Sequence, residues 1–160
     1  MAKVLIIDDD KGISYTLSSL VKQLGHEVIC AFNLEDGLKA AARESFDVVF
    51  LDVHMPDGNG LNALPVIRET PSKPEIIIIT AFGDPDGAEI AIKNGAWDYI
   101  QKPSSIKEMS LPIVRALQYR EEKLAQKPFI ALKRDAIIGR GPQIQASIDQ
   151  LVSIRKWINI

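Results

Sequence analysis

The chain of 160 residues has a single cysteine, Cys30, and few aromatic residues, which make up 6% of the sequence. One cysteine excludes an internal disulfide and fits a reducing compartment. No apolar run approaches the roughly 20 residues that a membrane-spanning helix needs, and the start, Met1-Ala2-Lys3, does not resemble a secretory signal. The net charge of -2 provides no basic excess for nucleic acid. These absences favour a soluble, cytoplasmic protein without direct nucleic-acid binding.

The sequence does contain short aliphatic runs that alternate with helical stretches. Continuous aliphatic runs are typical of parallel strands that are covered on both faces. The expected strands are residues 4–7, 27–31, 47–51, 75–80 and 97–101. The expected helices are residues 13–24, 34–43, 61–69, a segment between Asp84-Pro85 and Asn94-Gly95, and 106–125. A turn-rich loop, Met55-Pro56-Asp57-Gly58-Asn59-Gly60, leaves the third strand.

Five strand–helix units in this order predict an α/β fold with a doubly wound, five-stranded parallel sheet. Crossovers between parallel strands are almost always right-handed, which leaves few topologies. We expect the flavodoxin-like strand order 2-1-3-4-5 and an extended C-terminal helix.

Acids, a hydroxyl and a lysine follow or end these strands. Aspartates 8–10 follow the first strand, Asp52 follows the third, Thr80 ends the fourth and Lys102 follows the fifth. Because parallel strands open their carboxyl ends on one edge of the sheet, these groups are expected to meet in one pocket. Such a pocket suits a hard dication and a phosphoryl group. A solvated acidic loop is the simpler interpretation of aspartates 8–10 alone, but it does not explain their register with the other groups.

The motifs Ile6-Ile7-Asp8-Asp9-Asp10, Leu51-Asp52-Val53-His54-Met55-Pro56-Asp57-Gly58, Ile79-Thr80-Ala81 and Lys102-Pro103 resemble, in this order, the receiver domain of bacterial response regulators. The resemblance covers residues 1–125. It implies a signalling switch of a two-component system. The implied chemistry is limited to self-catalysed phosphoryl acceptance and autodephosphorylation, so the resemblance implies no other enzymatic activity. A partner sensor histidine kinase would present a phosphohistidine, and Asp52 would be the phosphoacceptor.

The resemblance also assigns the metal and phosphoryl ligands. Oxygen ligands suit Mg²⁺, which neutralises charge during phosphoryl transfer. The implied metal ligands are Asp9, Asp52 and the backbone carbonyl of His54, with Asp8 in support. The implied phosphoryl-binding residues are Thr80 and Lys102. Asp10 is either a helix cap or part of the metal shell.

Six residues have finer implied roles, and two of these roles have a simpler alternative. The Lys102–Pro103 bond is expected to be cis and to aim the lysine into the pocket, against an ordinary trans turn. Thr80 and Tyr99 are the expected switch pair, although Tyr99 is alternatively a plain strand aromatic. The side chains of His54 and Phe82 are expected to lie near the pocket and to tune dephosphorylation.

The last expected helix has a stripe of Leu111, Val114, Leu117 and Leu124, whose spacing suits a two-helix seam. Packing of this helix on its own sheet accounts for Leu111 and Val114, and the later residues favour a homodimer. We expect that dimer to use the face formed by the fourth helix, the fifth strand and the fifth helix. Pro112 marks either the helix start or a bend.

Residues 126–137 are expected to be a linker, and residues 138–160 the truncated start of a further module. Ile137-Ile138-Gly139-Arg140-Gly141-Pro142 and the following residues resemble the opening of the AAA+ ATPase module of nitrogen-regulator-like, sigma-54-dependent transcription activators. The chain contains no Walker loop to cradle ATP phosphates. We therefore expect a fragment of such an activator, or a naturally shortened product.

Three other functions stay open at this level. A freestanding receiver would act by phosphorylation-dependent protein binding, and sequence continuing into a Walker loop would argue against it. A Mg²⁺-dependent phosphatase with an aspartate nucleophile commonly has a second acid two residues later, where this chain has His54, which argues against this function. A flavin-binding protein of the same strand order has a Ser/Thr/Gly-rich phosphate loop after the first strand. This chain has aspartates 8–10 there, which would repel a phosphate.

Overall fold

The computed structural model describes residues 1–81, 83, 85–102 and 107–138. The chain divides into two compact units, Met1–Arg120 and Glu121–Ile160. The first unit contains the sheet, and the described part of the second unit continues the last helix. Among the described residues, no helix combines the length and the apolar character needed to cross a bilayer. Residues 139–160, which hold most of the segment expected to begin an ATPase module, lie outside the described residues.

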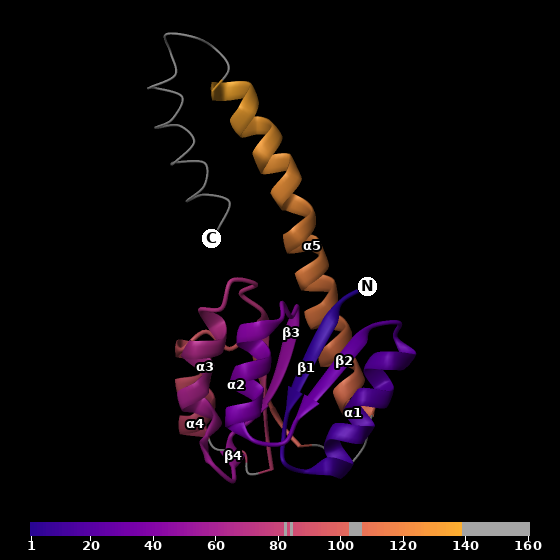
Figure 1. Ribbon diagram of the computed structural model, residues 1–160, viewed down its shortest axis with the longest axis vertical. Helices are drawn as coiled ribbons and strands as arrows, with labels where there is room; N and C mark the ends of the chain where they lie inside the picture. The colour runs from indigo at the N-terminus through magenta and orange to yellow at the C-terminus, as the bar shows by residue number, and fades with distance from the viewer. Residues whose placement is uncertain (82, 84, 103–106, 139–160) are drawn as a thin grey trace. The chain divides into compact units, whose positions relative to one another are not determined.

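The main sheet has five parallel strands in the order β2-β1-β3-β6-β7 (Figure 1). The strands are β1 (Lys3–Ile7), β2 (Glu27–Ala31), β3 (Val48–Asp52), β6 (Glu75–Thr80) and β7 (Asp98–Gln101). This order confirms the prediction of a flavodoxin-like sheet. The run of isoleucines in β6 is buried on both faces because β6 is an interior strand between β3 and β7.

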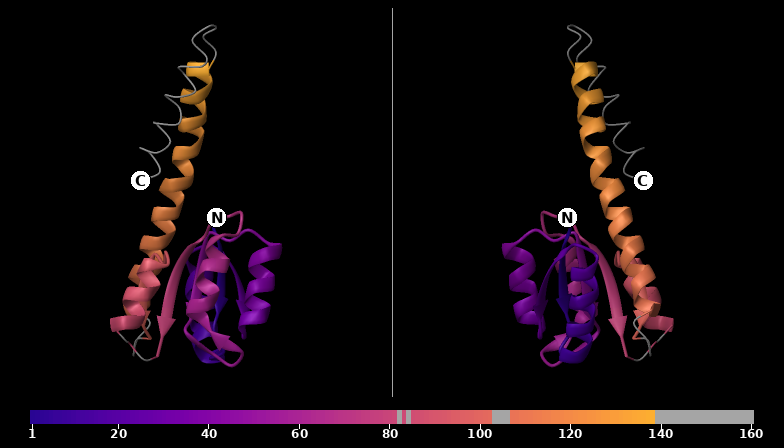
Figure 2. Two further views of the ribbon diagram at one scale, coloured as in Figure 1. Left: turned by 90° about the vertical axis from the view of Figure 1, so that its left-hand side faces the viewer. Right: turned by 90° about the vertical axis from the view of Figure 1, so that its right-hand side faces the viewer.

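Helices cover both faces of this sheet, as the side views show (Figure 2). They are α1 (Lys11–Gln23), α2 (Leu34–Arg43), α3 (Gly60–Arg68), α4 (Pro85–Lys93) and α5 (Lys107–Ile138). Successive strand residues point to opposite faces. Alternate strand residues therefore join two cores, one with α2, α3 and α4, and the other with α1 and α5.

Local signals explain where the helices begin and end. Asp10 caps α1 by accepting from the Ile13 amide at 3.2 Å, and Asn33 caps α2 by accepting from the Asp36 amide at 2.7 Å. Gly25 and Gly95 have φ values of 87° and 96°, which glycine adopts without strain, and they follow α1 and α4. The cap interpretation of Asp10 is therefore confirmed.

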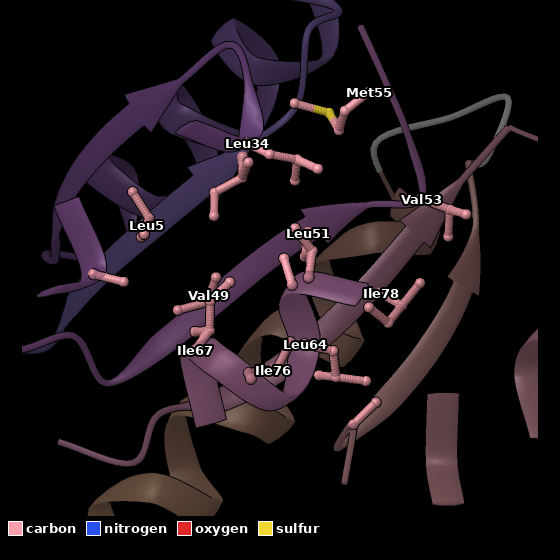
Figure 3. Close-up of a cluster of buried hydrophobic side chains, with 14 of the residues drawn as sticks. Leu5, Leu34, Val49, Leu51, Val53, Met55, Leu64, Ile67, Ile76 and Ile78 are labelled. Atoms are coloured by element: carbon pink, nitrogen blue, oxygen red, sulfur yellow. The ribbon is translucent and has the colours of Figure 1, made fainter. Parts of the chain in front are cut away.

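The segment after β3 is more ordered than the expected loop. The short strands β4 (His54–Met55) and β5 (Gly58–Asn59) pair antiparallel. The amide of Gly60 closes this hairpin by donating to the Val53 carbonyl at 2.7 Å. Met55 is 8% exposed and belongs to the same core as Leu34, at one end of the cluster in Figure 3. Strands of two residues are too short to leave a periodic signal, which is why the sequence indicated only turns.

The predicted end of the last helix was wrong, since α5 continues to Ile138 rather than stopping at residue 125. The stretch from Ala131 to Arg134 consists of strong helix formers, which favour continuation, although Pro128 within α5 opposes it. Pro112 lies within the second turn of α5.

One prediction for the inner side of α5 was also wrong, namely that Leu111 packs on the sheet. Leu111 is 53% exposed, and the side chains that fill the core are Met109, Ile113, Ala116 and Leu117. These four residues recur at helical spacing and define the inner stripe of α5, which leaves Leu111 on another side of the helix.

At the amino edge of the sheet, Arg120 anchors α5. Its guanidinium is buried, pairs with Asp47 at 3.3 Å and Glu75 at 3.6 Å, and donates to the carbonyl oxygens of Ser72 and Lys73. Buried cations require such paired and hydrogen-bonded surroundings. The polar groups that follow the strands lie at the opposite, carboxyl edge of the sheet.

Candidate functional site

At the carboxyl edge of the sheet, three residues from separate strands meet. Asp8 follows β1, Asp52 ends β3 and Lys102 follows β7. The Lys102 Nζ lies 3.0 Å from Asp8 Oδ2 and 3.1 Å from Asp52 Oδ2. Both aspartates are buried, with exposures of 2% and 3%. The structure thus brings together the acids and the lysine that the sequence placed at the strand ends.

Asp9 completes a cluster of carboxylates. Ligand oxygens of Asp8, Asp9 and Asp52 all lie within 4.8 Å of one another, and Asp9 is exposed. Asp8 Oδ2 is buried and, within the described part of the chain, accepts no hydrogen bond of good geometry despite its proximity to Lys102. An oxygen-only donor set with one face open to water fits Mg²⁺, which keeps several waters when bound to protein.

The electrostatics of this pocket favour a cation. Burial, with a smaller contribution from the charge of Asp52, raises the pKa of Asp8 to about 6, against the opposing effects of the Asp10 amide and Lys102. Burial opposes the charge of Lys102, but the hydrogen bond and charge of Asp8 and the charge of Asp52 outweigh it and raise the pKa of the lysine. The lysine therefore stays charged, and a dication would relieve the remaining repulsion among the carboxylates.

The raised pKa of Asp8 predicts a specific pH dependence in metal-free protein. The folded protein holds this proton more tightly than the unfolded chain, whose carboxyl group titrates near 3.8. The stability that this proton provides is fully present below about pH 4 and is lost as the pH rises through about 6. Urea unfolding in EDTA across this range should show the decline in wild type and not in Asp8→Asn. A constant difference in unfolding free energy between the two proteins would contradict the prediction.

Thr80 and Tyr99 lie on the two strands beside the pocket. Thr80 ends β6, is fully buried and pairs in register with Gln101 of β7. The Lys102 amide donates to the Thr80 carbonyl at 2.6 Å, which ties the ends of these strands together. Tyr99 is half-buried and packs against the core on the α2–α4 face. The predicted threonine thus lies beside the predicted lysine, and the switch role of the pair stays a prediction.

The structure supports the other predicted site residues, His54, Phe82 and Pro103, less directly. His54 is exposed in β4, and its amide donates to Asp52 Oδ1 at 3.4 Å, a long hydrogen bond. Phe82 and Pro103 lie outside the described residues. The tuning role of Phe82 and the cis bond between Lys102 and Pro103 therefore stay predictions.

Sequence reasoning missed the role of Gly60 at this site. A Cβ atom at this position would lie 1.9 Å from the backbone oxygen of Asp52 and 2.9 Å from its carbonyl carbon. Only a residue without a Cβ allows the start of α3 to pass this close to the phosphoacceptor candidate. The turn-rich composition marked Gly60 as a loop residue, but it carried no signal of the neighbouring backbone.

The fold and the pocket define a class of protein: a doubly wound α/β domain with an acidic, lysine-containing site at its switch point. The family model for the response regulator receiver domain matches residues 4–113, and the chain belongs to this family. This confirms the resemblance found in the sequence.

Curated relatives include regulatory protein AtoC of Escherichia coli, which is 34% identical over 121 residues, covering 76% of this chain and 26% of AtoC. The transcriptional regulator NtrC of Proteus hauseri is 35% identical over 144 residues, covering 89% of this chain and 30% of NtrC. The chain thus spans about a quarter to a third of the length of these two relatives. Both are named as regulators rather than as enzymes.

Solved structures show the same relationship. The beryllofluoride-activated NtrC4 receiver domain dimer is 35% identical with a TM-score of 0.69, covering 75% of this chain and 99% of that one. The beryllofluoride-activated DrrB receiver domain is 32% identical with a TM-score of 0.67, and the match covers 74% of this chain and 98% of that one. The similarity spans nearly the whole of each receiver domain and about three quarters of this chain.

Proposed function

We propose that this chain is the phosphorylation-dependent switch of a two-component system, in which Asp52 accepts a phosphoryl group from a sensor histidine kinase. The observation that carries this proposal is the position of the Lys102 ammonium between the carboxylates of Asp8 and Asp52, beside Asp9. Membership of the receiver family supports it. This role would place the chain in the cytoplasm with its kinase.

The residues present suit a Mg²⁺ ion. Asp9, Asp52 and the backbone carbonyl of His54 would hold it, with Asp8 in support. When bound, the ion supplies positive charge that neutralises the phosphoryl oxygens and the crowded carboxylates.

The side chains themselves perform the transfer. A carboxylate oxygen of Asp52 forms the new bond to phosphorus while the bond from phosphorus to the kinase histidine nitrogen breaks, and the electron pair leaves with that nitrogen. Lys102, already 3.1 Å from Asp52, is placed to pair with the phosphoryl oxygens. The Thr80 hydroxyl at the end of β6 would donate a hydrogen bond to one of them.

The response would then spread through Thr80 and Tyr99 to the face formed by α4, β7 and α5. A phosphoryl group adds nearly two negative charges, which can bias a bistable element. The helices of this face have exposed apolar side chains, Ile90 on α4 at 48% and Leu111 on α5 at 53%, and the rings of Trp97 and Tyr119 lie 5.9 Å apart. We propose that the face formed by α4, β7 and α5 is a homodimer interface. We also propose that His54 and Phe82 tune the lifetime of the phosphorylated state.

The output would be a sigma-54-dependent transcription activator. In this proposal residues 126–137 link the receiver to an ATPase module that begins at residues 138–160, and α5 continues through the whole of this linker. A change of dimer arrangement would gate that module.

Incubation with acetyl phosphate tests the proposed function. With Mg²⁺, intact mass should increase by one phosphoryl group and size-exclusion chromatography should show a larger species. The same incubation in EDTA should leave both unchanged, since the carboxylates then repel the phosphodonor. An unmodified mass in the presence of Mg²⁺ would overturn the proposal.

A further inference from the structure

The hairpin that follows Asp52 needs support from elsewhere in the fold. It consists of β4 and β5, two residues each, and a hairpin is marginally stable at best when isolated. His54 and the residues at the tip, Pro56, Asp57, Gly58 and Asn59, are exposed, while Met55 is buried. The position of His54, whose carbonyl is an expected metal ligand, therefore depends on what holds this hairpin.

Asp57 joins the hairpin tip to the first turn of α2. Its Oδ1 accepts from the Leu34 amide at 2.8 Å, and its Oδ2 accepts from the Glu35 amide at 3.0 Å. The first amides of a helix have no partner within the helix, and the helix N-terminus favours a negative charge. Asn33 takes the next amide, that of Asp36, at 2.7 Å. Two caps from different parts of the chain thus share the start of α2.

These hydrogen bonds also favour the charged form of Asp57. The Leu34 and Glu35 amides hold the pKa of its carboxyl group below the ordinary value of 3.8. The link between the hairpin and α2 therefore stays charged near neutral pH.

Apolar contacts act at the same place. Leu34 and Met55 belong to one core cluster and lie at the same end of it in Figure 3. A Cβ on Gly58 would lie 3.2 Å from Leu34 Cδ1, so the tip of the hairpin passes close to the first turn of α2. The hairpin is thus attached to α2 by both charge and packing.

The helix α2 is in turn fixed to the strand that bears the other acids. Gly37 passes so close to β1 that a Cβ there would lie 2.6 Å from Ile7 Cδ1. Ile7 directly precedes Asp8 and Asp9. The chain of contacts therefore runs from β1 through α2 and Asp57 to the hairpin that contains His54.

We propose that Asp57 is a positioning residue for the metal site, which holds the hairpin so that the His54 carbonyl lies at a fixed place relative to the aspartates after β1 and β3. This inference rests on the proposed function, because it concerns the same Mg²⁺. The ion demands near-ideal octahedral geometry, so a small displacement of one ligand weakens binding. Groups that orient ligands without touching the metal commonly matter for affinity.

Mg²⁺ titration of the full chain tests this inference, with Asn33→Ala as the matched control. Both Asp57→Ala and Asn33→Ala remove a cap from α2 and should lower Tm, but only the first releases the hairpin. Asp57→Ala should weaken Mg²⁺ binding about tenfold, and Asn33→Ala should stay within about twofold of wild type. Asp57→Asn keeps an acceptor oxygen for one amide and should fall between wild type and Asp57→Ala.

Amide hydrogen exchange in metal-free protein gives a second readout. Exchange at residues 54–59 should be faster in Asp57→Ala and unchanged in Asn33→Ala, because the control leaves the link to the hairpin intact.

The outcomes separate the two proposals. Wild type that binds Mg²⁺, together with Asp57→Ala of equal affinity, overturns the inference and leaves the proposed function standing. Equal weakening in Asp57→Ala and Asn33→Ala also overturns it, because helix capping alone would then explain the effect. Wild type that binds no Mg²⁺ overturns the proposed function, and with it the positioning role of Asp57.

Discussion

Asp52→Asn is expected to abolish phosphorylation by acetyl phosphate. The amide has nearly the same shape as the carboxylate but is not a nucleophile, so no acyl phosphate can form. Asp52 is 3% exposed and lies 3.1 Å from Lys102, so the substitution changes a buried carboxylate of the pocket. Intact mass after incubation with Mg²⁺ measures the loss.

Asp10→Asn is the matched control for this result. Asp10 is adjacent in sequence to the acidic cluster but is exposed and caps α1. Asparagine is an equally good cap, so this variant should be phosphorylated like wild type. Phosphorylation of Asp52→Asn at the wild-type level would show that another residue is the acceptor.

Gly60→Ala is expected to damage both stability and phosphorylation. The new Cβ would lie 1.9 Å from the Asp52 backbone oxygen, so the backbone of β3 or of α3 must move. Forcing extra atoms into such a contact costs about 3 kcal/mol of unfolding free energy. A displacement of Asp52 by about 1 Å would slow phosphorylation roughly a hundredfold. Urea unfolding and the rate of mass increase with acetyl phosphate measure the two effects.

Gly12→Ala makes the same substitution at an exposed position, where the single close neighbour is a side-chain oxygen that can shift and no backbone atom has to move. Gly12 is exposed in α1, and a Cβ there meets only Asp10 Oδ1 at 3.3 Å. Alanine is a better helix former than glycine by up to about 1 kcal/mol, which offsets the cost of a small shift of Asp10, so the stability of this variant should lie within about 1 kcal/mol of wild type. If Gly60→Ala unfolds at the same urea concentration as wild type, the close approach of α3 to Asp52 is not important for stability.

Much of the site was predictable because each of its residues is marked by a pattern in the few neighbouring residues of the sequence. Asp8, Asp52 and Thr80 each follow or end an aliphatic run, and a run of this kind indicates a strand without any knowledge of its neighbours. The handedness of crossovers then limits the strand order, and the order places the strand ends together. The contact between Lys102 and the two aspartates follows from these two general rules.

Other features were not predictable because they depend on segments far apart in the sequence. Leu111 and Ile113 are similar in character, yet one is 53% exposed and the other fully buried, since the docking angle of α5 decides which side meets the sheet. Nothing in the composition of the hairpin indicated that Asp57 contacts α2.

The sequence by itself determined the strands, most helix boundaries and the residue types that gather at the carboxyl edge, because periodicity and capping act over a few neighbouring residues. Only the tertiary structure decided how close Gly60 lies to Asp52 and which helix Asp57 caps. Those contacts join segments whose separation is set by the packing of the whole core, and no local pattern encodes that distance.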